Sequence, residues 1–593
     1  MARLPLLMTT TDERTTITGS SYVLTWLGGH HGVVHSPYLE LSDLEGNRWT
    51  RLCVLSSVHT VQAHDETVSI DEPIATREGD EILVRVRTSS SHWASRTLEV
   101  RCTHDAVELA LVAVGAGDLT DVTIAGGEGI VPTGASGTFR SSIDAASLFV
   151  PTPTEPVAFA RPATSAASLG VVGDADPGRV HGIFSPPPLV LAWSRARVEG
   201  PLVPPEGPTL AISLRAPVQE LRFTSLRYEP LDGGFLLRLP YEGHTAVDGT
   251  WRSPVVVLRP VTSAYQALTA FRDDLIAHDL APSNGPHVEP WWRQPLFCGW
   301  GAQVARGGAP APDLCRQDLY DEFLAILRAA HLEPGTIVVD DRWQHEYGTA
   351  EPDPEAWPDL RGWIAQRHAE GRRVLLWWKA WDPAGLPAGE CVTDAAGRPI
   401  AADPGSPAYR ARLRAIVTRL LGPDGLDADG FKVDFTQRAP SGRTMRAAPD
   451  SDGVWGIAAL HRLVAEIHAA AKAAKADSLV ITHTVHPSFG DVTDMIRTND
   501  VLERDTAGQP VPAALQLTAR HAIVSRVLPH HPIDTDQWPM PGRAEWLDYT
   551  RLQLTLGVPA LYYLERVRDD EPITADDLAG VRATWEDYRR ALG

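Results

Sequence analysis

The sequence predicts an α/β fold, in which a (β/α)8 TIM barrel is preceded by a large antiparallel β-sandwich. The first half of the chain carries short alternating runs separated by turn residues. The second half alternates short apolar runs with amphipathic stretches, and polar residues follow nearly every apolar run. At 593 residues the chain is too long for one core, so we expect a sandwich domain at 1–289 and a barrel at 290–593.

The β texture of the first half is clearest in five runs. They cover residues 21–26, 81–86, 97–102, 106–111 and 209–214. Turn residues separate these runs and long helical periodicity is absent, which is typical of a sandwich. Residues 264–279 have a helical pattern and are expected to connect the two domains.

The second half contains eight runs that we predict as strands. They are residues 296–300, 336–340, 373–378, 430–434, 479–484, 495–500, 532–538 and 558–563. Helices are expected at 314–331, 409–421, 457–475, 512–527, 543–554 and 575–592. Eight strands in about 300 residues suit a barrel. A doubly wound sheet is the competing fold, and it is disfavoured because no Gly-rich phosphate loop follows the first strand.

Composition excludes several classes of function. The net charge of −21 argues against general affinity for nucleic acid or an anionic membrane surface. No apolar run reaches about 18 residues and the N-terminus lacks a signal-peptide pattern, so we expect no membrane span and a cytoplasmic protein. The five cysteines form no C-x-x-C pair, and we expect neither a metal site nor a cofactor.

Active sites of barrels form at the C-terminal ends of the strands. The predicted ends collect carboxylates, cations and indoles. In strand order they carry Trp300, Asp340, Asp341, Trp343, Trp378, Lys379, Lys432, Asp434, His483, Arg497, Asp500 and Asp536. Lys432 and Asp434 lie two residues apart and therefore point to the same side of their strand. Paired carboxylates between aromatic walls indicate cleavage of a glycosidic bond.

Each of these residues also has a purely structural interpretation. Asp340 and Asp341 could cap the next helix, Lys432 could pair with a neighbour, and His483 could be a hydrogen-bonded core residue. Metal binding by His30 and His31 in a Gly-rich turn is the less favoured interpretation of that pair. For Asp434 and Asp500 taken together, the functional interpretation is favoured.

The motifs resemble those of glycoside hydrolase family 36, which contains α-galactosidases and raffinose-synthase-like galactosyltransferases. The raffinose-synthase-like motif D-D-G-W-Q is similar to residues 340–344, and D-G-V-K-V-D-V-Q is similar to residues 429–437. R-x-S-D-D-F resembles residues 497–502, P-D-W-D-M-F resembles residues 533–538, and W-H-A resembles residues 378–380.

The resemblance implies that Asp434 is the nucleophile and Asp500 the general acid/base of a retaining enzyme. It also implies that Asp340, Asp341, Lys432 and Arg497 bind sugar hydroxyls. The retaining mechanism requires carboxyl groups roughly 5–5.5 Å apart. Because α-galactosidases of this family are often oligomeric, a homo-oligomer is an open expectation.

The sequence departs from the family motifs at several positions. Arg342 stands in place of the Gly, Lys379 in place of the His, and Val501 in place of the second Asp of S-D-D. Asp505 is a rival for the acid/base role. An α-galactosidase acting on an oligosaccharide or glycoside is the leading hypothesis. An α-galactosyl transglycosylase, another α-glycosidase and a non-catalytic carbohydrate-binding barrel are the alternatives.

Overall fold

The N-terminal part of the chain is built from β-strands. The computed structural model describes residues 6–27, 36–151, 159–172, 184–200, 202–498, 500–501, 507–568 and 570–593. Strands β1 (Leu7–Thr10) to β21 (Val255–Ser263) join in one hydrogen-bonded sheet. Within the described residues its pairings are antiparallel, except for one parallel bridge between Gly129 and Thr67. His30 and His31 lie outside the described residues.

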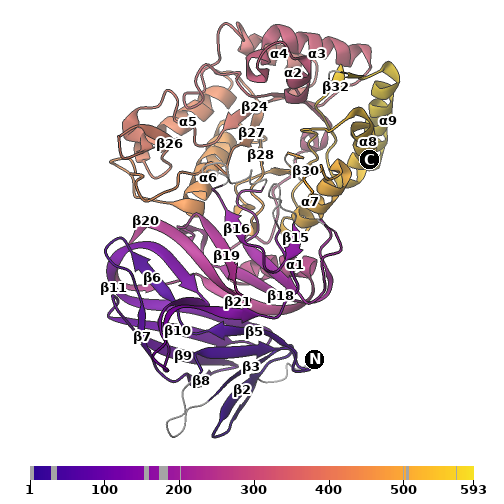
Figure 1. Ribbon diagram of the computed structural model, residues 1–593. Coiled ribbons are helices and arrows are strands. Elements are labelled where there is room, and N and C mark those ends of the chain that lie inside the picture. The colour runs from indigo at the N-terminus through magenta and orange to yellow at the C-terminus, as the bar shows by residue number, and fades with distance from the viewer. Residues whose placement is uncertain are drawn as a thin grey trace.

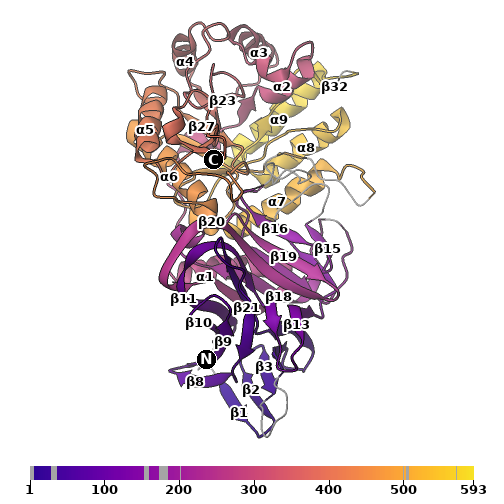
Figure 2. The ribbon, with the colours of Figure 1, turned by 60° about the vertical axis from the view of Figure 1, so that its left-hand side comes forward.

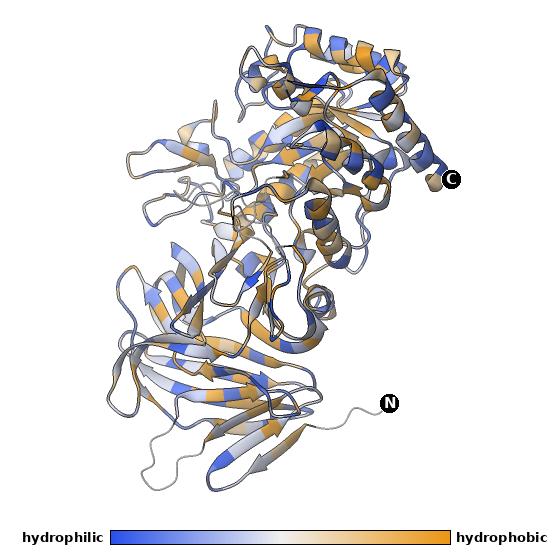
Figure 3. Ribbon diagram, turned by 45° about the vertical axis from the view of Figure 1, so that its right-hand side comes forward, coloured by the Kyte–Doolittle hydropathy of each residue, from blue (hydrophilic) through white to orange (hydrophobic). Residues whose placement is uncertain are grey.

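All five runs predicted as strands overlap strands of this sheet. They correspond to β3 (Val23–Leu27), β9 (Glu81–Ser90), β10 (Ser95–Cys102), β11 (Val107–Ile124) and β18 (Glu206–Arg215). Figure 3 shows hydrophobic and hydrophilic residues alternating along arrows of the N-terminal part, as expected for strands with one buried face. The sandwich architecture and the domain boundary at residue 290 stay predictions.

The C-terminal part contains an eight-stranded parallel sheet. Its strands are β22 (Leu296–Cys298), β23 (Thr336–Val339), β24 (Arg373–Lys379), β27 (Gly430–Asp434), β28 (Leu479–Thr482), β29 (Met495–Arg497), β30 (Ile533–Asp534) and β31 (Ala560–Leu561). They follow one another in chain order from β22 to β30, and β31 pairs with β22. A parallel bridge from Asp534 to Val558 links the last strands, so the sheet curls into a barrel-like form.

Helices surround this sheet. They are α2 (Trp300–Arg306), α3 (Gln317–Ala329), α4 (Leu360–Ala369), α5 (Pro407–Leu421), α6 (Gly456–Ala474), α7 (Ala513–Val527), α8 (Arg543–Leu556) and α9 (Ala575–Leu592). Figures 1 and 2 show α5 and α6 on one side of the parallel strands and α7 and α8 on the other. Within the described residues, no helix is long and apolar enough to cross a membrane.

Two local differences from the sequence prediction have clear causes. The first strand ends at Cys298 rather than Trp300, because Gly299 takes a helical conformation and Trp300 begins α2. Helix α4 was not predicted, because one position of its buried stripe is filled by Arg367 and the apolar pattern is interrupted.

The N-terminal strands lie next to the barrel-like part (Figure 1), and hydrogen bonds join the two parts. Glu242 of β20 (Gly234–Arg252) accepts hydrogen bonds from Ser441 Oγ at 2.7 Å and from the backbone N–H of Gly442 at 2.8 Å. Helix α1 (Ala264–Ala277) lies against α7, where Arg272 donates to the backbone oxygen of Arg526 at 2.8 Å. The loop after β27 is therefore held partly by the N-terminal strands.

Gly430, the first residue of β27, should not tolerate a side chain. Its φ is +146°, and a Cβ atom there would lie 1.9 Å from the backbone oxygen of Leu479 in β28. We expect Gly430→Ala to lower the free energy of unfolding by about 3 kcal/mol or more, because two paired backbones must move apart. Denaturant unfolding measures this. Gly389→Ala, where a Cβ meets nothing within 4 Å, is the control. Equal stability of the two variants would contradict the β27–β28 pairing.

Candidate active site

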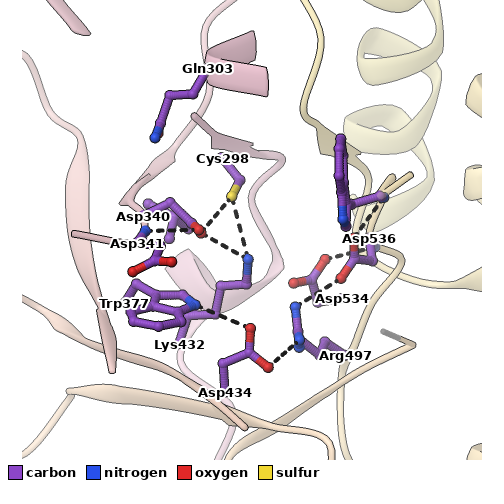
Figure 4. A network of polar contacts seen from close by, with 12 residues as sticks. Cys298, Gln303, Asp340, Asp341, Trp377, Lys432, Asp434, Arg497, Asp534 and Asp536 are labelled. Carbon is purple, nitrogen blue, oxygen red and sulfur yellow. Dashed lines mark hydrogen bonds and ion pairs between the residues drawn. The ribbon is translucent and has the colours of Figure 1, made fainter. Parts of the chain in front are cut away.

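A buried ion pair between β27 and β23 forms the floor of the site (Figure 4). Lys432 Nζ lies 2.9 Å from Asp340 Oδ2, and each side chain is 3% exposed. The Cys298 thiol donates to the same oxygen at 3.0 Å. Burial alone would lower the pKa of Lys432, but Asp340, together with the other acidic groups around the ammonium, outweighs burial and the pKa is raised. Lys432 is therefore held as a cation.

Asp434 follows Lys432 by two residues. Its side chain is 17% exposed and is therefore more accessible than that of Asp340. Its Oδ1 accepts from Arg497 Nη2 at 2.8 Å and from the Phe435 N–H at 2.8 Å. Its Oδ2 accepts from the Trp377 indole N–H at 3.2 Å. Burial would raise the pKa of Asp434, but Arg497, with His483 and Lys432, holds it well below its usual value. The group is an ionised carboxylate that remains open to a ligand.

Arg497 contacts acidic side chains from two strand ends, those of β27 and β30. Besides Asp434, its guanidinium contacts Asp536 Oδ2 at 3.2 Å, and both Arg497 and Asp536 are buried. Burial raises the pKa of Asp536, although Arg497 opposes the shift. Burial and the nearby Asp536 also raise the pKa of Asp534. Figure 4 shows these acids across the site from Asp341 and Trp377.

The opposite wall of the site is formed by residues at the ends of β23 and β24. Tyr347 donates its hydroxyl proton to Asp341 Oδ1 at 2.8 Å. Its ring lies 4.0 Å from Lys379 Nζ and 5.7 Å from the guanidinium carbon of Arg342. Burial raises the pKa of Asp341 to about 6. Arg342 has a φ of +76°, a region that costs a residue with a side chain about 1–3 kcal/mol.

The four other predicted aromatic and histidine positions differ in what they contact. Trp343 is fully buried and donates its indole N–H to the backbone oxygen of Trp377 at 2.8 Å. Trp378 packs edge-to-face on Phe431. His483 is buried, with Nδ1 4.0 Å from Asp434 Oδ1.

Trp300 is half-buried and packs edge-to-face on Trp538 at 5.9 Å between ring centroids. It therefore lies in an aromatic cluster formed by residues that follow β22 and β30.

Trp377 contacts Asp434, although Trp378 was the residue singled out from the sequence. In the β24–β27 register, Trp377 lies opposite Lys432 and Lys379 opposite Asp434. The alternation of strand side chains places Trp377 and Lys379 on the face of Lys432 and Asp434, and Trp378 on the other face. This alternation could have been read from the sequence. Cys298 and Tyr347 were also missed, and no motif in the sequence marked them.

Asp500 is half-buried and follows β29 by three residues. Its charge raises the pKa of Arg497 and of Asp536, which places it on their side of the site. Its rival Asp505 lies outside the described residues, as does Asn499. The sequence-predicted residues of β23, β24, β27, β29 and β30 are thus brought to one end of the sheet.

A separate cluster in the N-terminal strands offers metal-ligand atoms. His59, His64 and Glu128 place one ligand atom each within 4.8 Å of one another. The rings of the two histidines stack with centroids 4.1 Å apart, and His59 Nδ1 accepts from the backbone N–H of Asp65 at 3.0 Å. That acceptor role leaves the proton of a neutral His59 on Nε2, which is unfavourable for metal binding at Nε2.

Comparison with known proteins gives matches of structure. The chain matches no protein-family model and no curated protein. A GH31 family sulfoquinovosidase from E. rectale, in complex with an aza-sugar inhibitor, has a TM-score of 0.57 and 10% identity, over 98% of this chain and 82% of that one. The GH36 α-galactosidase AgaB from Geobacillus stearothermophilus has a TM-score of 0.53 and 10% identity, over 99% and 86%.

A third similar structure is TtGalA, an α-galactosidase from Thermus thermophilus in complex with stachyose. It has a TM-score of 0.51 and 14% identity, over 87% of this chain and 99% of that one. At these identities the likeness shows the fold, which is that of structures in two glycoside hydrolase families.

Ionisation of Asp341 should make stability fall as pH rises. Its folded-state pKa of about 6 lies above the unfolded value of about 3.9, so its contribution is complete below about pH 4 and lost as pH passes 6. Asn keeps an acceptor for Tyr347 but cannot titrate. Between pH 4 and pH 7, we expect Asp341→Asn to lose about 2 kcal/mol less unfolding free energy than wild type. Chemical denaturation across this range measures it, and identical pH profiles would contradict the assignment.

Proposed function

We propose that this protein is a retaining α-glycosidase acting on terminal sugars, with α-galactosides as the leading substrates. The observation that carries the proposal is the state of Asp434. It is an ionised carboxylate at the C-terminal end of a barrel strand, held by Arg497 and Trp377 and still partly open. Such a group is suited to attack an electrophilic carbon. The strand-end motifs and the glycosidase fold support the same class.

In the first step, Asp434 attacks the anomeric carbon. Oδ1 already accepts two short hydrogen bonds, whereas Oδ2 accepts a single longer one from Trp377. We therefore assign Oδ2 as the attacking atom. A bond forms between Oδ2 and the anomeric carbon as the glycosidic C–O bond breaks, and the leaving oxygen takes a proton from Asp500.

In the second step, Asp500 takes a proton from water, and the water oxygen displaces Asp434 from the same carbon. Two inversions give net retention. Arg497 stabilises the Asp434 carboxylate when it leaves, since its guanidinium contacts Oδ1 and not the attacking Oδ2. Asp341, Asp340, Lys432 and His483 are proposed to bind or position sugar hydroxyls around this carbon.

Galactose is proposed because two of the similar structures are named α-galactosidases, and because the strand-end motifs resemble that family. Another similar structure is named a sulfoquinovosidase, so other α-linked sugars are included in the test. Transfer to a sugar hydroxyl would use the same residues. Adding an acceptor sugar and measuring transfer product against free sugar separates transfer from hydrolysis.

Removing the nucleophile tests the proposal directly. We expect Asp434→Asn to lower kcat on a panel of 4-nitrophenyl α-glycosides by about a thousand-fold or more, because the covalent step is lost. The matched control is Asp429→Asn. Asp429 precedes the same strand at its other end, where its buried carboxylate contacts His368, Arg373 and Lys475. This control should lose stability but keep kcat within about five-fold.

A fluorinated glycosyl fluoride that accumulates the intermediate should lose its anomeric fluoride and add the mass of the remaining fluoroglycosyl group to the peptide containing Asp434. Release of the inverted anomer, or full activity of Asp434→Asn, would overturn the assignment.

The acid/base role of Asp500 predicts a dependence on the leaving group. Asp500→Asn should cost about 10²–10⁴-fold on a methyl glycoside, whose oxygen needs protonation, and far less on a glycosyl fluoride. Asp505→Asn, made in parallel, should show the wild-type ratio of the two rates. If Asp505→Asn shows the leaving-group dependence instead, the proton donor is Asp505.

A further inference from the structure

Two cations lie on one aromatic ring at the wall formed by β23 and β24. Lys379 Nζ is 4.0 Å, and the Arg342 guanidinium carbon 5.7 Å, from the centre of the Tyr347 ring. We propose that Arg342 and Lys379 form an anion-binding subsite that selects α-glycosides carrying a negatively charged group on the terminal sugar. This inference rests on the proposed function and adds the substrate class.

Two aromatic side chains, Tyr347 and Trp377, connect the cation pair to the proposed nucleophile. The Tyr347 ring packs edge-to-face on Trp377 with centroids 5.9 Å apart, and the Trp377 indole donates to Asp434. Lys379 also lies opposite Asp434 in the register of β24 and β27. A sugar held with its anomeric carbon at Asp434 therefore lies on the same face of β24 and β27 as this wall.

Arg342 is the cation that is available to a ligand. Lys379 is paired with Asp382 at 2.8 Å, which fixes its position. Arg342 is exposed, and no carboxylate among the described residues lies within ion-pair distance of its guanidinium. A guanidinium can bind a carboxylate or sulfonate through two parallel N–H···O bonds, with the Lys379 ammonium as a second point charge.

The backbone at Arg342 supports a role for this side chain. Its φ of +76° lies in the region that suits glycine, and glycine stands at this position in the motif that residues 340–344 resemble. A long cation is kept where glycine would relieve the strain. Strained residues gather at ligand sites, so the conformation of Arg342 is consistent with a ligand-binding role for its side chain.

The anion belongs to the sugar rather than to the leaving group. β23 and β24 lie on one side of β27, whereas Asp500 and Asp536 follow β29 and β30 on the other. Figure 4 shows Asp341 and Trp377 across from Arg497 and Asp536. The leaving group must face its proton donor, so the ring atoms farthest from the glycosidic bond face Arg342 and Lys379.

Matched pairs of 4-nitrophenyl α-glycosides test the inference. The pairs are galactoside with galacturonide and glucoside with glucuronide, together with a glucoside carrying a sulfonate at C6. A control substrate carries the carboxylate on the phenyl leaving group instead of on the sugar. We expect kcat/KM at least ten-fold higher for the anionic sugar of one pair, with no gain from the charged leaving group. The preference should fall with added salt, because the subsite is exposed.

Two variants remove the cation. Arg342→Gly also removes the backbone strain, and Arg342→Gln keeps a long side chain. Each should reduce the anionic-to-neutral ratio of kcat/KM at least ten-fold, mainly through KM. Arg551→Gln, on the exposed surface of α8, is the control and should keep the wild-type ratio. A wild-type preference for the neutral sugars, or an unchanged ratio in both Arg342 variants, overturns the subsite and leaves the proposed function standing.

Failure of the proposed function would be recognised separately. If wild type cleaves none of these glycosides, calorimetry with the free sugars decides the inference. Tighter binding of galacturonate than of galactose, or of glucuronate than of glucose, lost in Arg342→Gly, supports the subsite without catalysis. Equal binding of acid and neutral sugar overturns it.

Discussion

The Lys432–Asp340 ion pair is the constraint on which the rest of the barrel-like part depends. Two charges that are each 3% exposed must be paired, because removing one partner of such a pair typically costs about 3–5 kcal/mol. The pair joins β27 to β23 at the end of the sheet where the polar residues collect. With Lys432 fixed, the strand alternation fixes Asp434 on the same face, and Arg497 then neutralises Asp434 and Asp536 together. Lys432 and Arg497, both buried, thus connect the ends of β23, β27, β29 and β30.

The N-terminal part of the chain contributes to the site through the loop after β27. The Thr436 hydroxyl donates to the backbone oxygen of Ser185 at 2.9 Å, and the backbone N–H of Ser185 donates to the carbonyl oxygen of His483 at 3.1 Å. Ser185 therefore contacts the segments that follow both β27 and β28. Glu242 holds the same loop farther along. A long loop after a strand end has few partners of its own, and these contacts restrict where the Asp434 side of the site can move.

The sequence predicted the parts of the fold that repeat a simple pattern. All eight parallel strands lie at the predicted runs, because a short apolar run between turn residues leaves few alternatives. Trp300 and Trp343 show what could not be predicted from the sequence. A tryptophan is equally apolar whether it faces a ligand or fills the core, and only packing decides that Trp343 donates to Trp377. Helix α4 was not predicted because Arg367 fills a position on its buried face where an apolar residue is expected. The buried Arg367 side chain pairs with Glu370.

The same reasoning accounts for a shared fold at 10–14% identity. A barrel needs only short apolar runs for its strands between amphipathic helices, which many sequences satisfy. Under the proposed mechanism, chemistry adds few further positions: two carboxylates, the cations that keep one of them ionised, and the hydroxyl-binding acids. The wall of Arg342, Tyr347 and Lys379 is not among them, so it is free to differ between enzymes with the same chemistry. Specificity is therefore the property of this chain that fold similarity constrains least, and the residues that depart from the family motifs are where it should be sought.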